Sequence, residues 1–347
     1  MGGVALLLWG LHMVQSGILR AFGPELRRFL STALQNRLAA FASGLGLTAL
    51  LQSSTATSLM AASFVNEGAV ALVPALAIVL GANVGTTLIV QLLSFNVSAA
   101  APALFVLGLL AFRSGGRSRL KDVGRVAIGL GLMLLALHIL LDTLAPAEEA
   151  PSVRALLKLI TSDPLFCVLI AAALTWAAHS SVATVLLTMS LTFSQFITPA
   201  AALALVLGAN LGSAINPVLE GTQRGDPSSY RLPLGNLFNR LIGVCLTLPF
   251  LQQIVDVAQR FEPNTARLTA ELHVGFNIVL AAIFLPLLDP LAAMLIKLLR
   301  TGKLPSTRQL RAISTKPHSI RPRSPWRTRR AKHFIWVTPL KRCSNRL

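Results

Sequence analysis

Charge is scarce in this sequence. Of its 347 residues only 13% are Asp, Glu, Lys or Arg, whereas 54% are hydrophobic. A soluble globular domain carries roughly 25% charged residues, about twice this share. The composition therefore excludes an ordinary soluble domain and favours a chain that lies largely within a lipid bilayer.

Cysteine and the short motifs of common enzymes are also nearly absent. The spacing of Cys167, Cys245 and Cys343 fits neither a zinc site nor a disulfide framework. The sequence has no Walker loop, no HExxH and no CxxC pair. No pair of carboxylates is placed convincingly for catalysis. We therefore expect a protein that is not an enzyme and that needs no cofactor.

Long apolar runs are what the sequence has instead. A helix needs about 20 apolar residues to cross the ~30 Å hydrocarbon core of a membrane. The first run is too long for a signal peptide and lacks a basic start and a cleavage site, so we expect it to be retained. We predict an all-α integral membrane protein with several spans. Examples of such runs are Gly2–Leu19, Val123–Leu141, Leu165–Leu191, Ala200–Leu219 and Leu268–Leu288.

Two segments of the chain repeat each other. LTALLQSSTATSL (Leu47–Leu59) matches LTWAAHSSVATVL (Leu174–Leu186), and ALAIVLGANVGTT (Ala75–Thr87) matches ALALVLGANLGSA (Ala202–Ala214). Both pairs have the same offset, 127 residues, with no gap between them. Internal repeats of this kind determine the architecture. We predict repeat 1 over residues 1–112, repeat 2 over 126–250 and a closing transmembrane segment over 251–300.

Loop charges predict how the two repeats are oriented. The predicted loop at 113–125 is rich in Lys and Arg, which places it in the cytoplasm. The loop after the next helix contains Asp142, Glu148 and Glu149 and suits the outside, whereas the equivalent helix of repeat 1 ends among Arg20, Arg27 and Arg28. Equivalent helices thus end in loops of opposite character. This pattern indicates inverted-topology repeats, which are common in secondary transporters.

The last part of the chain differs from the rest. From Arg300 to Leu347 there are fourteen Lys or Arg and no Asp or Glu. The whole chain has a net charge of +18, so the residues before Arg300 carry a net charge of +4. We expect residues 301–347 to be a disordered cytoplasmic tail. A truncated or frame-shifted gene end is our leading explanation. A segment that binds anionic lipid comes next, and a nucleic-acid arm is a distant third.

A dense polar motif interrupts the apolar sequence in each repeat. Gln52–Ser58 has six polar residues out of seven and follows Gly44 and Gly46, and it recurs as His179–Thr184. Ser and Thr can bond to the preceding helical turn or join helices, which is the structural alternative. We favour a broken or re-entrant helix, whose exposed N–H groups, dipole and hydroxyls would bind an anion without Lys or Arg. Backbone carbonyls and Gln and Ser oxygens could also coordinate a cation.

The second motif is Gly81–Thr87, which recurs as Gly208–Ala214. Its paired glycines permit either a helix break or a close helix contact. Asn83 and Asn210 can offer a carbonyl oxygen to a cation or an N–H to an anion, and a packing role is the alternative. In repeat 2 we expect Asn216-Pro217 to break the helix again.

These motifs together resemble the type II sodium–phosphate cotransporter family, especially its bacterial members. The likeness extends to GLHMVQSGI near the start, to NLFNR at Asn236–Arg240 and to HVGFN at His273–Asn277, and it covers about residues 1–300. It implies an inverted-repeat transporter whose paired re-entrant hairpins bind phosphate and sodium. The function that it implies is sodium-coupled symport of inorganic phosphate across the cytoplasmic membrane. Bacterial relatives often continue into a PhoU-like helical domain, and we expect no such domain in residues 301–347, which are rich in Pro, Ser and Arg.

The motifs and the resemblance together give a set of candidate site residues. His179 stands where the family usually has Gln, and Val182 where it has a small hydroxyl residue. Because histidine titrates near neutral pH, ion stoichiometry and pH dependence stay open. We expect sodium to be held through Gln52, Ser54, Asn83, Ser181 and Asn210. The predicted substrate- and ion-binding residues are Gln52, Ser53, Ser54, Thr55, Thr57, Asn83, Thr86, His179, Ser180, Ser181, Thr184, Asn210 and Ser213.

Two other functions remain open beside phosphate symport. The first is transport of another anion or with another coupling ion, which His179 suggests. The second is a degenerate paralogue that does not transport, which the altered second motif and the unusual tail suggest. The expected partners are inorganic phosphate, sodium ions and membrane lipid, without nucleic acid. A homodimer is allowed but is not determined by the sequence.

Overall fold

The computed structural model describes residues 2–32, 36–94, 100–113, 118–144, 161–222 and 226–300. Every regular element within these ranges is a helix, which confirms the all-α fold class. The predicted tail at 301–347, and Glu148 and Glu149 of the predicted outer loop, lie outside the described residues.

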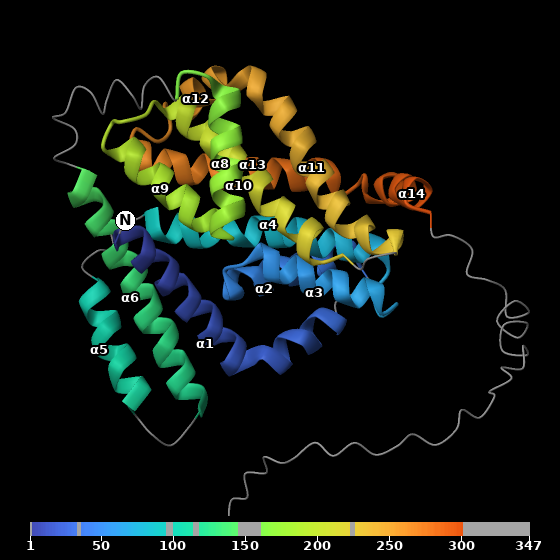
Figure 1. Ribbon diagram of the computed structural model, residues 1–347, viewed down its shortest axis with the longest axis horizontal. Coiled ribbons are helices and arrows are strands. Elements are labelled where there is room, and N and C mark those ends of the chain that lie inside the picture. Colours follow the sequence, from blue (N-terminus) through green and yellow to red (C-terminus); the bar gives the residue numbers. More distant parts are fainter. Residues whose placement is uncertain are drawn as a thin grey trace, which may run out of the picture. The chain divides into compact units, whose positions relative to one another are not determined.

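The helices follow one another closely along the chain (Figure 1). The first part contains α1 (Gly2–Thr32), α2 (Arg37–Leu51), α3 (Ser54–Asn66), α4 (Leu72–Ser94), α5 (Ala100–Arg113) and α6 (Ser118–Leu144). The second contains α8 (Pro164–Ala178), α9 (Ser181–Phe193), α10 (Pro199–Glu220), η2 (Pro227–Tyr230), α11 (Arg231–Thr247), η3 (Leu248–Phe250), α12 (Leu251–Ala258), α13 (Thr265–Phe284) and α14 (Leu288–Leu298).

Six helical segments of the described chain are long and apolar enough to cross a membrane. A shorter helix, α5, also has an apolar outer surface, where the side chains of Val106, Leu107, Leu109 and Leu110 are all exposed. Such surfaces suit lipid rather than water. The chain is therefore a multi-pass membrane protein. The six segments are Gly2–Gly23, Leu72–Ser94, Arg119–Leu140, Pro199–Glu220, Pro227–Ala258 and Thr265–Phe284.

Two long helices, α4 and α10, form the centre of the packing. The short helix α2 lies along α4, and the short helix α8 lies along α10 (Figure 1). The two sets interlock, because α3 also contacts α10, α9 contacts α4, and α13 contacts both long helices. Helices α1, α6 and α5 pack side by side, α6 between the other two. Equivalent pieces of the two repeats thus meet one another around α4 and α10.

The glycines of the second motif serve close helix contact. A Cβ atom added to Gly81 of α4 would lie 1.9 Å from the carbonyl oxygen of Phe41 in α2. A Cβ added to Gly208 of α10 would lie 2.3 Å from the carbonyl oxygen of Val168 in α8. Backbone atoms cannot move aside as a flexible side chain can, so both positions require glycine. Of the two interpretations of this motif, close contact is confirmed, and α4 and α10 run through it without a break.

Two expectations about local structure were wrong. Asn216-Pro217 does not end its helix: α10 continues to Glu220 with Pro217 inside it, as neighbouring helices allow for proline within membranes. Much of the predicted basic loop is helical, because α6 begins at Ser118 and Arg and Lys are good helix formers. The other boundaries of the repeats stay predictions.

Candidate functional site

The first polar motif breaks the chain into two helices. Gln52 ends α2 in the left-handed conformation, with φ of 53°, and Ser53 is extended. The Ser53 hydroxyl oxygen accepts a hydrogen bond from the Ala56 N–H at 3.1 Å and caps α3. Serine at an N-cap satisfies one of the four N–H groups that a helix start leaves without a partner. Two residues therefore suffice to end one helix and begin the next.

The two helices on either side of this break are joined by threonines. The Thr48 hydroxyl of α2 donates to the Thr57 hydroxyl of α3 at 2.7 Å, and both side chains are buried. The Thr57 hydroxyl in turn donates to the Ser53 carbonyl oxygen at 3.2 Å. A pair of hydroxyls that satisfy each other is stable in an apolar setting. Thr57 therefore holds the shape of the break and does not line an open space.

The second polar motif repeats this geometry residue by residue. His179 ends α8 with φ of 51°, and Ser180 caps α9 by accepting from the Ala183 N–H at 3.1 Å. Thr175 donates to Thr184 at 2.8 Å, the equivalent of the pair in repeat 1. Each of these positions follows its counterpart by 127 residues. The predicted helix break is confirmed at both motifs, and Thr184 has the same internal role as Thr57.

Both breaks meet at one cavity. Eight of the thirteen candidate residues line it, together with Gln15 and Val182. The space is about 10 Å³, close to what one water molecule needs and too small for phosphate. The lining groups thus lie too close together to hold an anion of that size. The lining residues are Gln15, Gln52, Ser53, Ser54, Thr55, Thr86, His179, Ser180, Ser181 and Val182.

The cavity has the chemistry of an anion site. It receives the N-terminal turns of α3 and α9, whose first residues are Ser54 and Ser181. The first N–H groups of a helix have no acceptor within that helix, and the dipole makes this end positive. The hydroxyls of the lining serines and of Thr55 add further donors, whereas the Thr86 hydroxyl already donates to the Ala82 carbonyl oxygen at 3.0 Å. None of the lining residues is Lys or Arg, so an anion would be held by neutral donors alone.

The residues that end α2 and α8 differ between the repeats. Gln52 is buried, and its Oε1 atom has no hydrogen-bond partner. A buried polar atom of this kind is rare and destabilising unless a ligand or water satisfies it. The side chain of His179 is 58% exposed, and its Nδ1 atom lies 3.2 Å from the Glu220 carboxylate. The first half of the site therefore presents an unpaired oxygen, and the second presents a histidine turned toward a carboxylate.

Three other candidates, Asn83, Asn210 and Ser213, lie away from the cavity lining and surround Arg240 of α11. The Arg240 guanidinium donates to the Asn83 Oδ1 atom at 2.6 Å. It also donates to the carbonyl oxygen of Asn210 and to the hydroxyl of Ser213. Arg240 is among the largest fully buried side chains of the described chain. The structure thus divides the predicted site into a cavity and a buried arginine cluster.

Two further asparagines complete the arginine cluster. The Asn83 amide donates to Asn236 Oδ1 at 2.9 Å, and the Asn277 amide donates to Asn210 Oδ1 at 3.0 Å. Asn236 and Asn277 belong to the family-like segments noted in the sequence, to which we had given no role. Each repeat therefore contributes its motif asparagine to one connected network.

Sequence reasoning missed Arg240 and Gln15. A signal for Arg240 was present, because a lone arginine within an apolar segment marks a functional position by default. Gln15 carried no comparable signal, and only the fold brings its amide 3.5 Å from the Gln52 carbonyl oxygen.

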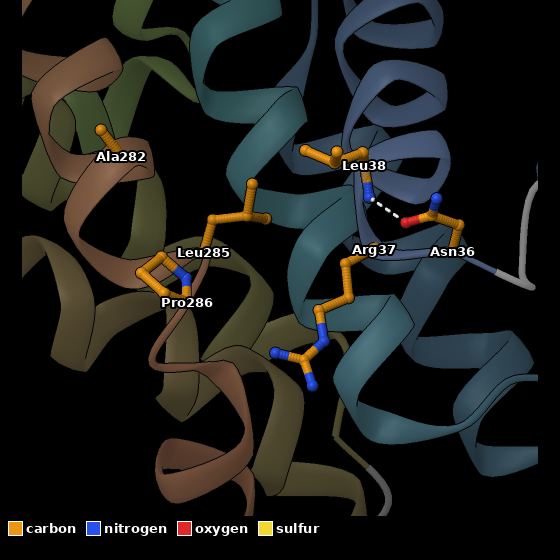
Figure 2. A pocket seen from close by; sticks show the side chains of 6 residues that line it. All are labelled: Asn36, Arg37, Leu38, Ala282, Leu285 and Pro286. Atoms are coloured by element: carbon orange, nitrogen blue, oxygen red, sulfur yellow. Dashed lines mark hydrogen bonds between the residues drawn. The ribbon is translucent and has the colours of Figure 1, made fainter.

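A larger hollow lies elsewhere, where α2 begins and α13 ends (Figure 2). It measures about 600 Å³ and contains none of the motif residues. Its one charged lining group, Arg37, forms an ion pair with Asp289. Asn36 accepts from the Leu38 N–H at 3.0 Å and caps α2. These polar groups are already used by the fold, so we do not regard this hollow as the functional site.

Comparison with known proteins agrees with the repeat and the motifs. A family model described as Na+/Pi-cotransporter matches residues 6–142 and again 147–284. "Putative inorganic phosphate export protein YjbB" of Escherichia coli K12 is 40% identical over 292 residues, which cover 84% of this chain and 54% of that protein. Its Salmonella typhimurium counterpart is 38% identical over 300 residues, which cover 86% of this chain and 55% of that protein.

A more distant relative is matched over nearly its whole length. "Uncharacterized protein YqeW" of Bacillus subtilis is 28% identical over 284 residues, which cover 82% of this chain and 92% of that protein. By contrast, the chain spans about half the length of the YjbB relatives. No solved structure matches the chain. The family model covers well over half of the sequence, in two copies, and the chain therefore belongs to the Na+/Pi-cotransporter family.

Proposed function

We propose that this protein carries inorganic phosphate across the cytoplasmic membrane, with the cavity between the two helix breaks as the phosphate site. The observation that carries the proposal is the convergence of both breaks on one cavity. Two helix N-termini and several hydroxyls face one point there, and all of these groups donate to oxyanions. Family membership and the printed name of the YjbB relatives support phosphate as the anion.

The donors of the site favour release as well as binding. Phosphate held by arginine is bound by strong bidentate contacts. Here the lining offers N–H and O–H groups without formal charge, so the anion is bound weakly enough to be exchanged between the two sides. The cavity measures only about 10 Å³, so phosphate binding requires the walls to separate. Relative movement of the two short-helix pairs, as inverted re-entrant hairpins, would provide alternating access.

Sodium is the coupling ion that we propose. The unpaired Gln52 Oε1 atom and the hydroxyls of Ser54 and Ser181 are neutral oxygen ligands at the cavity. Such oxygens are suited to hard cations. Asn83 and Asn210, which we expected to share this role, already direct oxygens toward Arg240 and Asn277. The sodium proposal therefore rests on the cavity residues.

Transport of phosphate in purified vesicles tests the proposal. The full chain is reconstituted into liposomes, and the flux of radiolabelled phosphate is measured with inward, outward and no sodium gradient. Flux that follows the sodium gradient supports symport, and both directions of flux are measured because the YjbB name specifies export. Phosphate flux without sodium dependence points to another coupling ion. The absence of phosphate flux would overturn the proposal and favour another anion or a paralogue that does not transport.

A further inference from the structure

Arg240 places a buried positive charge between the two repeats. Its guanidinium is held by Asn83 from α4 and by Asn210 and Ser213 from α10. Asn83 and Asn210 are equivalent positions of the repeated motif, separated by 127 residues. The arginine itself comes from a third helix, α11. The charge therefore lies where equivalent polar positions of the repeats come together.

The partners of Arg240 are neutral oxygens. They are one amide oxygen, one backbone carbonyl oxygen and one hydroxyl oxygen. None of the ion pairs in the described part of the chain includes Arg240. A buried charge without an opposite charge is destabilising, and in a membrane it marks a functional position. Structural packing alone would be served better by an apolar side chain at this place.

The oxygens around the guanidinium are of the type that binds a free cation. Amide, carbonyl and hydroxyl oxygens are the ligands of hard metal ions. The cluster is also near the anion cavity, because Thr86, which lines the cavity, is one helical turn from Asn83. Ser213, the counterpart of Thr86, contacts Arg240 directly. A positive charge in this cluster is therefore placed to balance an anion in the cavity.

We propose that Arg240 is a tethered cation that occupies the position of a mobile coupling ion between the repeats. This inference rests on the proposed anion transport. It adds that one positive charge near the anion belongs to the protein and is not supplied by an ion from solution. Arginine keeps its charge at every physiological pH, so this site needs no ion from solution. The chain should then require one coupling cation fewer than a protein with the same oxygens and an apolar residue at position 240.

Equilibrium binding of radioactive sodium to the purified chain in detergent tests this directly. Arg240→Ala removes the guanidinium and leaves the oxygens, so it should bind about one more sodium ion per chain than the original protein. Adding Asn83→Ala to this variant should abolish the gain, because it removes an oxygen ligand. Arg240→Lys keeps a positive charge and should show no gain. Equal sodium binding by the original chain and Arg240→Ala, or a gain in Arg240→Lys, would overturn the inference.

A second measurement, on a variant of more similar size, is made in case Arg240→Ala does not fold. Arg240→Met preserves most of the side-chain volume, and gel filtration shows whether each variant is intact. In vesicles without sodium, Arg240→Met should bind phosphate about tenfold more weakly, a loss typical of one interaction with a charged group. Added sodium should restore the affinity in Arg240→Ala, which leaves space for the ion, but not in Arg240→Met, whose side chain fills that space. Failure of sodium to restore a folded Arg240→Ala, or full restoration of Arg240→Met, would contradict the proposal. Sodium binding needs no phosphate flux, so failure of the transport proposal would be seen separately.

Discussion

The two halves of the site share a backbone and differ in two of their lining side chains: Gln52 corresponds to His179, and Thr55 corresponds to Val182. Gln52 and His179 have nearly the same left-handed conformation, with φ of 53° and 51°. The serine caps after them have the same 3.1 Å bond. Yet the Gln52 side chain is buried with an unpaired oxygen, whereas His179 is exposed and faces Glu220.

This difference distinguishes the groups that are present in both halves of the site from those that vary between the halves. The donors that both halves retain are backbone N–H groups at helix starts and the serine hydroxyls. These groups recognise an oxyanion whatever residue precedes them. The residue that ends the first helix of each pair differs between the repeats, although both Gln52 and His179 line the cavity. We infer that the anion is bound by the shared part and that coupling is adjusted at the variable part.

The largest effect should follow from removing the shared hydroxyls. Ser54→Ala or Ser181→Ala deletes a donor to phosphate, and a hydrogen bond to a charged group is worth about 1.5–3 kcal/mol. Phosphate affinity should fall by roughly tenfold to a hundredfold. Radiolabelled phosphate uptake over a range of phosphate concentrations measures the change. Equal losses from the two substitutions would show that the two halves contribute equally.

Matched controls lie on the same helices. Ser58 of α3 and Ser190 of α9 are buried, and their hydroxyls have no hydrogen-bond partner in the structure. Their replacement by Ala removes the same atom from the same helix at a residue that does not line the cavity. Phosphate affinity should be unchanged in these controls. Full affinity in Ser54→Ala and Ser181→Ala as well would mean that the motifs only pack the helices.

The next effect concerns packing, where the repeats also differ. Gly44 of repeat 1 corresponds to Ala171 of repeat 2. A Cβ on Gly44 would lie 1.9 Å from the carbonyl oxygen of Ile78. Gly44→Ala should therefore separate α2 from α4 and lower the free energy of unfolding by about 1–3 kcal/mol, as overpacking does. The melting temperature of the purified protein in detergent measures this loss.

Gly46→Ala is the control for that substitution. It lies on the same helix, but an added Cβ there has no atom within 4 Å. Alanine is the better helix former by about 1 kcal/mol, so stability should stay equal or rise. A Gly44→Ala protein as stable as the Gly46→Ala protein would show that repeat 1 can adopt the wider spacing of repeat 2.

Much of this architecture was predictable from the sequence because it depends on local rules. The repeat offset, the helix breaks at Gln52 and His179 and the approach of the two motifs follow from polar residues inside apolar runs. The backbone cannot leave such polar groups facing lipid. The predicted helix break at Asn216-Pro217 was wrong, because the effect of a proline depends on neighbouring helices and not on the dipeptide alone.

The arginine cluster was not predictable from the same rules. Asn83 and Asn210 were predicted to bind an ion, and both are buried, but their partner Arg240 is 157 residues from Asn83 in the chain. Only the packing of α11 against α4 and α10 brings them together. Nothing in the motif itself could distinguish a free cation from a protein cation, because the same oxygens bind either.

The smallest effect should come from making the variable residues alike. His179→Gln restores in repeat 2 the residue of repeat 1 and removes the contact with Glu220. Exposed ion pairs contribute about 0–1 kcal/mol, so phosphate affinity should change by less than about fivefold. The pH profile of uptake should change as well, because the substitution replaces an ionisable group by one that is not ionisable. Glu220→Gln keeps His179 but removes its carboxylate partner. This variant therefore distinguishes the effect of the imidazole ring from the effect of its contact with Glu220. Titration of phosphate itself is common to all variants and cancels in the ratio to the original chain. If His179→Gln left the shape of that profile unchanged, the residue that ends α8 would have no part in coupling, and the two halves would differ only in side-chain identity.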